Sequence, residues 1–365
     1  MEVGSRAVED VEEMKEKRTV LVTGNAGYIG TVMTGYLRDR SYRVFGLDTG
    51  YFSDDLLYPA PEGSKPDRQT VKDIRDVCAA DLEGVDAVVH LAALSNDPLG
   101  EINPGLTEEV NFKSTIRLAG LCKDAGVNRF IFASSCSIYG ISGTDAPVDE
   151  KGKLNPVTAY AKAKVRAEEG LSKLADRNFH PVFMRNATVY GLSPRLRLDL
   201  VVNNLLAWAY LTKEVAIMSD GKPWRPILHI EDFCAAFAAA LEAPEDKVHN
   251  EAFNVGQDTE NYRVKDIAAE VQKAVPGSEV RILNKTGADE RSYKVDFSKI
   301  RRKLQGFRPC WGLKAGIGQL LEAYNGYGLT REGFDSERYF RIRAIRSLMK
   351  EGKIDNNLRR TGGKR

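Results

Sequence analysis

Short apolar runs alternate with longer amphipathic segments through the first half of the chain. The runs are rich in Val, Ile, Leu and Phe, which is typical of strands buried on both faces of a sheet. Segments 28–40, 104–126 and 155–177 have the length and apolar spacing of helices. Strands that alternate with helices predict an α/β fold with a doubly wound parallel sheet. The predicted strands lie within residues 18–24, 42–48, 86–94, 128–135 and 180–186.

The alternation of strands and helices breaks after Gly191, where Arg and Pro become frequent and the elements become shorter. We expect a charged N-terminal tail at residues 1–18, a sheet domain at 19–190 and a smaller domain at 191–330. The smaller domain is expected to be interleaved with late strands of the sheet.

Residues 331–365 form a basic C-terminal segment with 11 Lys and Arg against 5 Asp and Glu. A helical period within this segment gives one apolar face, made of Tyr339, Ile342, Ile345 and Met349. A basic amphipathic helix can bind a membrane surface or a partner groove. We expect this one to pack on its own domain and to end in a frayed tail, which is the commoner arrangement.

A glycine-rich turn follows the first predicted strand and opens the first helix. Its sequence, TGNAGYIG, spans residues 23–30 and carries Gly24, Gly27 and Gly30. In this context glycines let the backbone approach a pyrophosphate at a helix N-terminus, although an ordinary strand-to-helix turn gives the same pattern. Asp48 ends the second strand, where a carboxylate binds ribose hydroxyls and repels a 2′-phosphate. The pattern favours a Rossmann-type sheet that binds NAD rather than NADP.

Tyr160 and Lys164 lie one helical turn apart in a segment rich in Ala, Lys and Glu. Helical spacing puts both side chains on one face, so spacing alone does not distinguish a helix surface from an active site. The chemistry of the pair suits catalysis. A phenol has a pKa near ~10 and is a weak base at neutral pH unless a neighbouring ammonium stabilises the phenolate.

Several motifs together resemble the extended short-chain dehydrogenase/reductase family, specifically its NAD-dependent nucleotide-sugar epimerase/dehydratase group. The similarity runs from about Thr19 to about Tyr327. The shared motifs are the glycine spacing Gly24-x-x-Gly27-x-x-Gly30, DIRD at 73–76, HLAAL at 90–94, SSCSIYG at 134–140 and Tyr160-x-x-x-Lys164.

The resemblance implies a role for each matching residue. Tyr160 takes a proton from the sugar, and Lys164 stabilises the phenolate and reaches the nicotinamide ribose. Ser135 holds the reacting oxygen of the sugar, with Ser134 as the alternative. The implied cofactor-binding residues are Gly24, Asn25, Ala26, Gly27, Tyr28, Ile29, Gly30, Asp48, Asp73, Ile74, Leu91, Ala92, Ala93, Tyr160 and Lys164. The implied substrate-binding residues are Ser95, Ser135, Thr188, Arg225 and Arg291.

The resemblance also implies that the smaller domain holds the nucleotide diphosphate of the substrate. Arg225, in WRPILHIED, and Arg291, in DERSYKVD, are the expected phosphate ligands. A planar guanidinium suits this role because it grips phosphate with two parallel hydrogen bonds. His229 is expected to be structural. Arg195 and Arg197 fit either the pocket or a solvated loop equally well.

The chain departs from the family pattern at Thr188, where many relatives have Asn. Asn186 lies two residues earlier, and either residue could serve in contacts to the sugar and phosphate.

Two neutral residues, Cys136 and Ser137, follow Ser135. In the family's sugar 4,6-dehydratases these positions carry an Asp and a Glu that act as acid and base in the loss of water. Neither neutral side chain replaces such a carboxyl pair, although Cys136 could act as an acid/base thiol if it is not a buried structural cysteine.

The expected activity is therefore NAD-dependent epimerisation of a nucleotide sugar at C4, through a transient 4-keto intermediate. A dehydratase, dehydrogenase or keto-sugar reductase on the same scaffold is the alternative within this class. A non-catalytic NAD-sensing protein is the alternative from another class. The presence of Ser135, Tyr160 and Lys164 argues against a sensor, because a sensor needs no phenolate.

The composition excludes some classes of partner. The 365 residues carry a formal net charge of +2, so no global charge favours nucleic acid or an anionic membrane. No apolar run approaches the roughly 20 residues of a membrane span, and the first 18 residues are charged rather than apolar. The five Cys and four His lack the spacing of a disulfide framework or a metal site. We expect a cytoplasmic protein without a metal, and the resemblance implies a homodimer.

Overall fold

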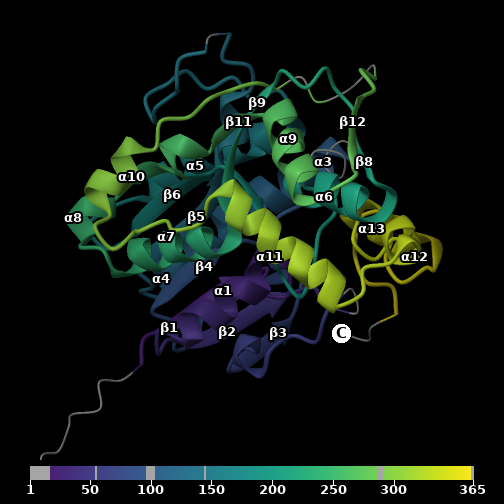
Figure 1. Cartoon of the computed structure of the whole chain (residues 1–365). Coiled ribbons are helices and arrows are strands. Elements are labelled where there is room, and N and C mark those ends of the chain that lie inside the picture. Colours follow the sequence, from purple (N-terminus) through teal and green to yellow (C-terminus); the bar gives the residue numbers. More distant parts are fainter. Residues whose placement is uncertain are drawn as a thin grey trace, which may run out of the picture.

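A seven-stranded sheet, with all neighbouring strands parallel, forms the centre of the protein (Figure 1). The structure is a computed structural model that describes residues 17–53, 56–95, 103–143, 145–285, 289 and 291–362. The strand order is β10 (Glu251–Val255), β6 (His180–Asn186), β5 (Arg129–Ser135), β4 (Ala87–His90), β1 (Thr19–Thr23), β2 (Arg43–Asp48) and β3 (Arg68–Val71). The predicted α/β fold with a doubly wound parallel sheet is confirmed.

Helices cover both faces of the sheet (Figure 1). Helices α1 (Tyr28–Arg38) and α7 (Ile230–Glu242) pack on one face, and α4 (Ser114–Asp124) and α5 (Ala159–Leu174) pack on the other. Because successive side chains of a strand point to opposite faces, Val20 of β1 belongs to the first core and Leu21 to the second. Burial on both sides explains why the five predicted strands lack an alternating polar pattern, whereas the edge strand β3 alternates between half-buried and exposed residues.

The segment predicted as one helix at 104–126 has three parts in the structure. It begins with α3 (Pro104–Glu108), which Asn103 caps by accepting a hydrogen bond from the backbone of Leu106. A π-helical turn follows at Glu109–Lys113 and leads directly into α4. The prediction therefore gave the right extent, but the π-helical turn leaves no mark in the apolar spacing.

The chain from Thr188 onward supplies the strands of two smaller sheets and returns once to the large sheet. The return strand is β10, which lies at the edge of the large sheet beside β6. The division of the chain into two functional domains at residue 190 stays a prediction. The other elements are β7 (Thr188–Tyr190), α6 (Val201–Thr212), β8 (Glu214–Ile217), β9 (Trp224–His229), α8 (Glu245–Val248), β11 (Asn261–Arg263), α9 (Val264–Ala274), β12 (Glu279–Ile282), α10 (Ser298–Lys303), α11 (Leu313–Gly326) and α12 (Arg331–Asp335).

The basic C-terminal segment packs on its own chain, as expected. Helix α13 (Arg341–Lys350) buries Ile345, and Tyr339 is buried just before it. The expectation of a frayed tail is wrong for the described residues. After α13 the chain forms a small hairpin in which Ile354 bridges residue 360, and both Ile354 and Leu358 are buried in the core. Burial of these two apolar side chains stabilises the hairpin.

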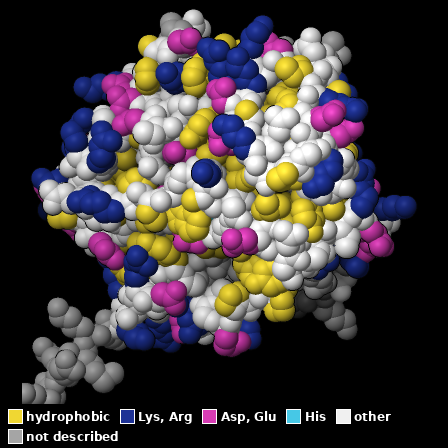
Figure 2. Space-filling view, in the orientation of Figure 1, with side chains coloured by type: hydrophobic (Ala, Val, Ile, Leu, Met, Phe, Trp, Pro, Cys, Tyr) yellow, Lys and Arg dark blue, Asp and Glu magenta, His cyan; other side chains and the backbone are white. Residues whose placement is uncertain are grey.

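The surface carries charges of both signs. On the face shown in Figure 2, Lys and Arg side chains are spread over the molecule with Asp and Glu between them. Among the described residues, no helix is both long enough and apolar enough to cross a membrane.

Candidate active site

A cavity of about 1200 Å³ opens at the C-terminal ends of β1, β2, β4, β5 and β6. Residues of α6, β8 and β9 line its other side. This edge is where open α/β sheets bind their ligands. All residues predicted to bind cofactor or substrate line the cavity, except Asn25 and Ala26.

The glycine-rich turn brings the backbone close to the cavity. Gly24 has a φ of 74°, and a Cβ atom there would lie 2.9 Å from the backbone nitrogen of Ala92. A Cβ atom on Gly30 would lie 2.1 Å from the carbonyl oxygen of Gly24. Side chains at these two positions would therefore break the turn. Residues 27–30, at the start of α1, line the cavity. The first N–H groups of a helix have no acceptor within the helix, so this end suits an anionic group.

Asn25 and Ala26 contact protein groups. The side chain of Asn25 donates a 2.7 Å hydrogen bond to Gln69, and the N–H of Ala26 donates a 3.1 Å bond to Asp48. The other carboxylate oxygen of Asp48 accepts a 2.8 Å bond from the N–H of Gly50. Burial raises the pKa of Asp48, and these hydrogen bonds oppose the rise. Asp48 therefore lines the cavity and also accepts one hydrogen bond from the glycine-rich turn and one from the loop that follows β2.

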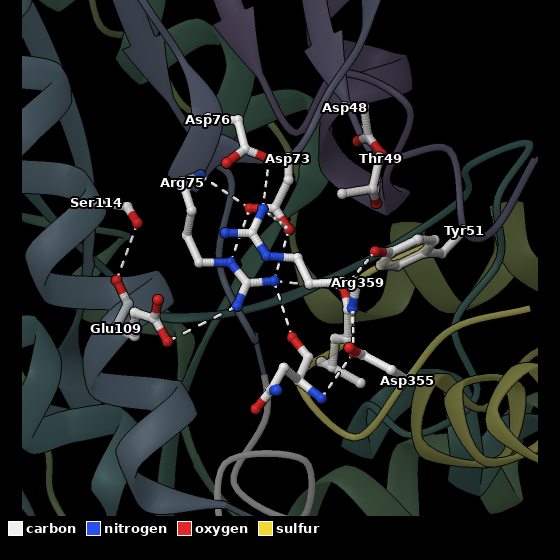
Figure 3. A network of polar contacts seen from close by, with 12 residues as sticks. Asp48, Thr49, Tyr51, Asp73, Arg75, Asp76, Glu109, Ser114, Asp355 and Arg359 are labelled. Carbon is white, nitrogen blue, oxygen red and sulfur yellow. Dashed lines mark hydrogen bonds and ion pairs between the residues drawn. The ribbon is translucent and has the colours of Figure 1, made fainter. Parts of the chain in front are cut away.

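Asp73 and Ile74 line the end of the cavity beside Asp48. The carboxylate of Asp73 accepts bonds of 3.0 and 2.7 Å from the guanidinium of Arg75, as Figure 3 shows. Burial would raise the pKa of Asp73, but the bonds from Arg75 outweigh it and hold that pKa below its usual value. The sequence motif DIRD indicated Asp73, but it did not indicate that Arg75 binds its carboxylate.

Tyr160 and Lys164 occupy one face of α5, which Thr158 caps at its N-terminus. The Nζ atom of Lys164 donates a 2.6 Å hydrogen bond to the carbonyl of Ala133 and lies 5.5 Å from the centre of the Tyr160 ring. Burial lowers the pKa of Lys164 to about 7. Both side chains line the cavity, so the structure brings this pair to the same place as the glycine-rich turn.

Ser135 and Ser134 have different surroundings. Ser134 is buried and its hydroxyl donates a short hydrogen bond to Glu168, which in turn pairs with Arg185 at 2.7 Å. The hydroxyl oxygen of Ser135 accepts a 3.1 Å bond from the N–H of Ser137, which leaves its proton for another acceptor. The geometry therefore favours Ser135 over Ser134 as the serine that reaches a ligand.

Cys136 points away from the cavity. It is 1 % exposed, and its thiol donates a 3.1 Å hydrogen bond to the carbonyl of Arg185. Burial raises the pKa of the Cys136 thiol far above its usual value. This thiol is structural, and the alternative of an acid/base thiol is not supported. Ser137 lines the cavity.

Arg225 and Arg291 share one carboxylate. Asp289 forms ion pairs with Arg225 at 2.8 Å and with Arg291 at 2.6 Å. Burial would raise the pKa of Asp289, but the bonds from Arg291 and the charge of Arg225 lower it to about 2. All three residues line the cavity. Sequence analysis missed Asp289, although its position two residues before Arg291 allows this local contact.

Arg197 belongs to the cavity rather than to a solvated loop. It is 6 % exposed, its Nε bonds Asp199 at 2.9 Å, and its Nη1 donates a 3.1 Å bond to the hydroxyl of Ser95. Asp199 is a second lining residue that sequence analysis missed. Arg195 does not line the cavity and donates instead to the carbonyl of Ser53 at 2.8 Å.

Asn186, the last residue of β6, and Thr188, the first residue of β7, both line the cavity. The amide nitrogen of Asn186 donates to the carbonyls of Ser134 and Met184, each at 2.9 Å. Its side-chain oxygen is buried without a hydrogen-bond partner among the described residues. His229 is buried, bonds Gln319 at 2.9 Å and stays outside the cavity, as expected.

Comparison with known proteins identifies relatives over most of the chain. A UDP-glucuronate 4-epimerase from Thermodesulfobacterium geofontis is 27 % identical over 319 residues, which are 81 % of this chain and 93 % of the relative. The solved UDP-glucuronic acid 4-epimerase from Bacillus cereus, in complex with UDP-glucuronic acid and NAD, is 25 % identical with a TM-score of 0.71. That match covers 84 % of this chain and 99 % of the solved chain.

A third relative has a different activity. It is the solved NAD-dependent NDP-hexosamine 5,6-dehydratase TunA, which is involved in tunicamycin biosynthesis. TunA is 26 % identical with a TM-score of 0.75, and the match covers 85 % of this chain and 98 % of the TunA chain. The family described as "NAD dependent epimerase/dehydratase family" matches residues 20–256. This chain therefore belongs to the NAD-dependent epimerase/dehydratase family of enzymes.

Proposed function

We propose that the protein is a nucleotide-sugar epimerase that acts at C4 through a transient 4-keto sugar. The observation that carries the proposal is the arrangement of Ser135, Tyr160 and Lys164 around one cavity, without a carboxyl pair beside Ser135. The two residues that follow Ser135 are a buried thiol and a hydroxyl.

The carboxyl groups of the cavity support this choice over water elimination. Among the described residues, those that line the cavity are Asp48, Asp73, Asp199 and Asp289. Asp48 accepts from two backbone N–H groups, and each of the others is bound by at least one Arg. An acid/base pair for dehydration needs carboxyl groups that are available to the sugar.

The residues present fit NAD. Gly24 and Gly30 leave no room for side chains where the backbone approaches the cavity, so the N–H groups at the start of α1 are positioned for the pyrophosphate. We assign Asp48 to the adenosine ribose and Lys164 to the nicotinamide ribose, and both residues line the cavity. Bound NAD supplies an acceptor, and afterwards a donor, for the hydride of the sugar C4.

The protein's own residues transfer the proton and orient the sugar. The Tyr160 phenolate takes the proton of the 4-hydroxyl, and Ser135 holds that oxygen by a hydrogen bond. The ammonium of Lys164, one helical turn away, favours the phenolate. Tyr160 returns the proton when the keto group is reduced from its other face. Arg225 and Arg291 are our candidates for the diphosphate of the substrate, with residues 191–330 as the nucleotide-sugar half.

A nucleotide-sugar dehydratase is the second candidate, because one solved relative is a 5,6-dehydratase. Both candidates are tested by incubating the purified protein with a panel of nucleotide hexoses, pentoses and uronic acids. Proton NMR and mass spectrometry of the products distinguish them. We expect a C4 epimer of unchanged mass and no lasting NADH. A product lighter by one water overturns the epimerase assignment, and lasting NADH indicates a dehydrogenase.

We also propose that the enzyme is a cytoplasmic homodimer that associates through the helices before and at Tyr160. The family resemblance supports this arrangement. Light scattering of the purified protein at several concentrations tests it, and a monomer at micromolar concentration contradicts it.

A further inference from the structure

We propose that the C-terminal residues 341–362, here called the clasp, form the outer wall of the adenosine end of the cofactor site and hold bound NAD in place. The inference rests on the proposed function, because it takes the cavity as the NAD site. Arg341 and Ile345 of α13 and Leu358 of the hairpin line the same cavity as Ile74. The clasp lies outside the segment 20–256 that the family match covers.

Hydrogen bonds connect the tip of the hairpin to the loops at the C-terminal ends of the sheet strands, here called the cofactor edge (Figure 3). The hydroxyl of Tyr51, which follows β2, donates a 2.5 Å bond to the carbonyl of Leu358. The guanidinium of Arg75 donates a 2.9 Å bond to the carbonyl of Asn357. The tip therefore connects the loops after β2 and β3, which lie 307 and 282 residues earlier in the sequence.

Ion pairs reinforce this connection. Arg359 lies 3.5 Å from the carboxylate of Asp73 and makes a closer contact with Asp76. Arg360 donates a 2.7 Å bond to the carbonyl of Thr49, next to Asp48. Asp73 thus lines the cavity and anchors the clasp at the same time. This dual position couples the cofactor edge to the C-terminal hairpin.

The backbone of Leu358 indicates that its side chain is held in a specific place. Its φ is 52°, a left-handed conformation that the Cβ atom of a Leu disfavours. Such a conformation persists when the surroundings determine it. Here the side chain is only 6 % exposed and belongs to the same apolar cluster as Ile74 and Ile354. The hairpin therefore presents an apolar side chain to the cavity.

This arrangement suits an epimerase. The hydride leaves the sugar and returns to it, so the cofactor need not exchange between turnovers. Leu358 covers a nucleotide whose adenosine end lies beside Ile74. The nucleotide leaves when the contacts that Tyr51, Arg75 and Arg359 make between the clasp and the sheet domain break. The clasp thereby slows dissociation of the cofactor without touching the reacting sugar.

Hydrogen exchange measured by mass spectrometry tests the clasp in the full chain, first freed of nucleotide and then compared with and without added NAD. The N–H groups of Leu358 and Thr361 make hydrogen bonds inside the hairpin, to Asp355 and Lys353. We expect NAD to slow exchange in peptides that cover the hairpin. Unchanged exchange there, in a protein that binds NAD, overturns the proposal.

The dissociation rate of NAD gives a second test. Arg359→Ala removes two ion pairs and is expected to speed dissociation about threefold to tenfold, whereas Arg346→Ala, an exposed Arg on α13, is the matched control. Leu358→Ala removes the apolar wall and is expected to act in the same direction. Circular dichroism verifies folding of each variant. Equal rates in all variants overturn the clasp but leave the proposed function intact. Failure of the wild-type protein to bind NAD overturns both.

Discussion

The ammonium of Lys164 lies 5.5 Å from the centre of the Tyr160 ring, and the same ammonium donates a 2.6 Å hydrogen bond to the carbonyl of Ala133. Burying a cation next to a neutral phenol costs free energy. This cost falls when the phenol loses its proton, because the phenolate then pairs with the cation. The position of Lys164 beside Tyr160 therefore affects both the stability of the nucleotide-free protein and the reactivity of Tyr160.

The first prediction concerns stability. The folded-state pKa of Lys164, about 7, lies below the value in the unfolded chain. Well below pH 7, both states bind the proton and the folded protein bears the full cost of the buried charge. This cost falls as the pH rises toward the unfolded pKa. Lys164→Met should therefore stabilise the nucleotide-free protein at pH 6 by about 1–2 kcal/mol, with a smaller gain at pH 10.

Urea unfolding at the two pH values measures this effect. Lys162→Met, at an exposed position on the same helix, is the matched control and should show little change at either pH. A gain for Lys164→Met that is independent of pH would contradict the assignment of a depressed pKa.

The second prediction concerns Tyr160. Tyr160→Phe removes the proton acceptor and should fold and bind NAD normally, while turnover falls at least ~10²-fold. The exposed Tyr327 provides a matched control, because Tyr327→Phe changes a phenol outside the cavity. Turnover assays and NAD titration measure the two effects. Near-normal turnover in Tyr160→Phe would exclude this residue from the mechanism.

The third prediction separates the two serines. Ser135→Ala should lower turnover roughly 10-fold or more, because Ser135 lines the cavity, with a loss of stability of about 1 kcal/mol or less from the lost bond to the N–H of Ser137. Ser134→Ala should lower stability by about 1–3 kcal/mol, because it removes a buried hydrogen bond to Glu168. Steady-state kinetics and thermal unfolding of both variants test this. The reverse pattern would make Ser134 the serine that holds the sugar.

The fourth prediction concerns the shared carboxylate. Asp289→Asn should bind a nucleoside diphosphate about threefold to tenfold more tightly than the wild type, because Arg225 and Arg291 no longer pair with a competing anion. Arg225→Ala should bind it more weakly. Isothermal titration with the nucleoside diphosphate alone measures both. Weaker binding by Asp289→Asn would show instead that Asp289 orients the two guanidinium groups.

The fifth prediction concerns cofactor choice. Asp48 lines the cavity at the end of β2, so NAD should bind at least about tenfold more tightly than NADP, whose 2′-phosphate would approach a carboxylate. Asp48→Asn should reduce this preference. Fluorescence titration with both cofactors gives the dissociation constants. Tighter binding of NADP to the wild type would rule out the role of Asp48.

The predictions from sequence succeeded where the signal is local. The glycine-rich turn, the apolar strands and the Tyr160/Lys164 spacing each occupy a short segment, and their periodicity or residue type reports the structure directly. The same holds for the C-terminal helix, whose apolar face includes the buried Ile345.

Contacts between distant segments could not be predicted from those patterns. The link from Arg75 to Asn357 joins residues that no periodicity relates. Without that contact, residues 351–362 have the polar composition of a loose tail. Asp199 and Asp289 were missed for a different reason. Each pairs with an Arg two residues away, but an acidic residue next to an Arg is common on solvated loops, so the pattern by itself indicates little.

The ion pair between Glu168 and Arg185 has a consequence for how the sequence can vary. Both residues are 7 % exposed, and their closest oxygen and nitrogen atoms lie 2.7 Å apart. Loss of either partner alone leaves a buried charge, at a cost of about 3–5 kcal/mol. Joint replacement by apolar residues of similar volume can be nearly neutral. Natural substitutions at these two positions should therefore occur together, so that homologues carry both charges or neither.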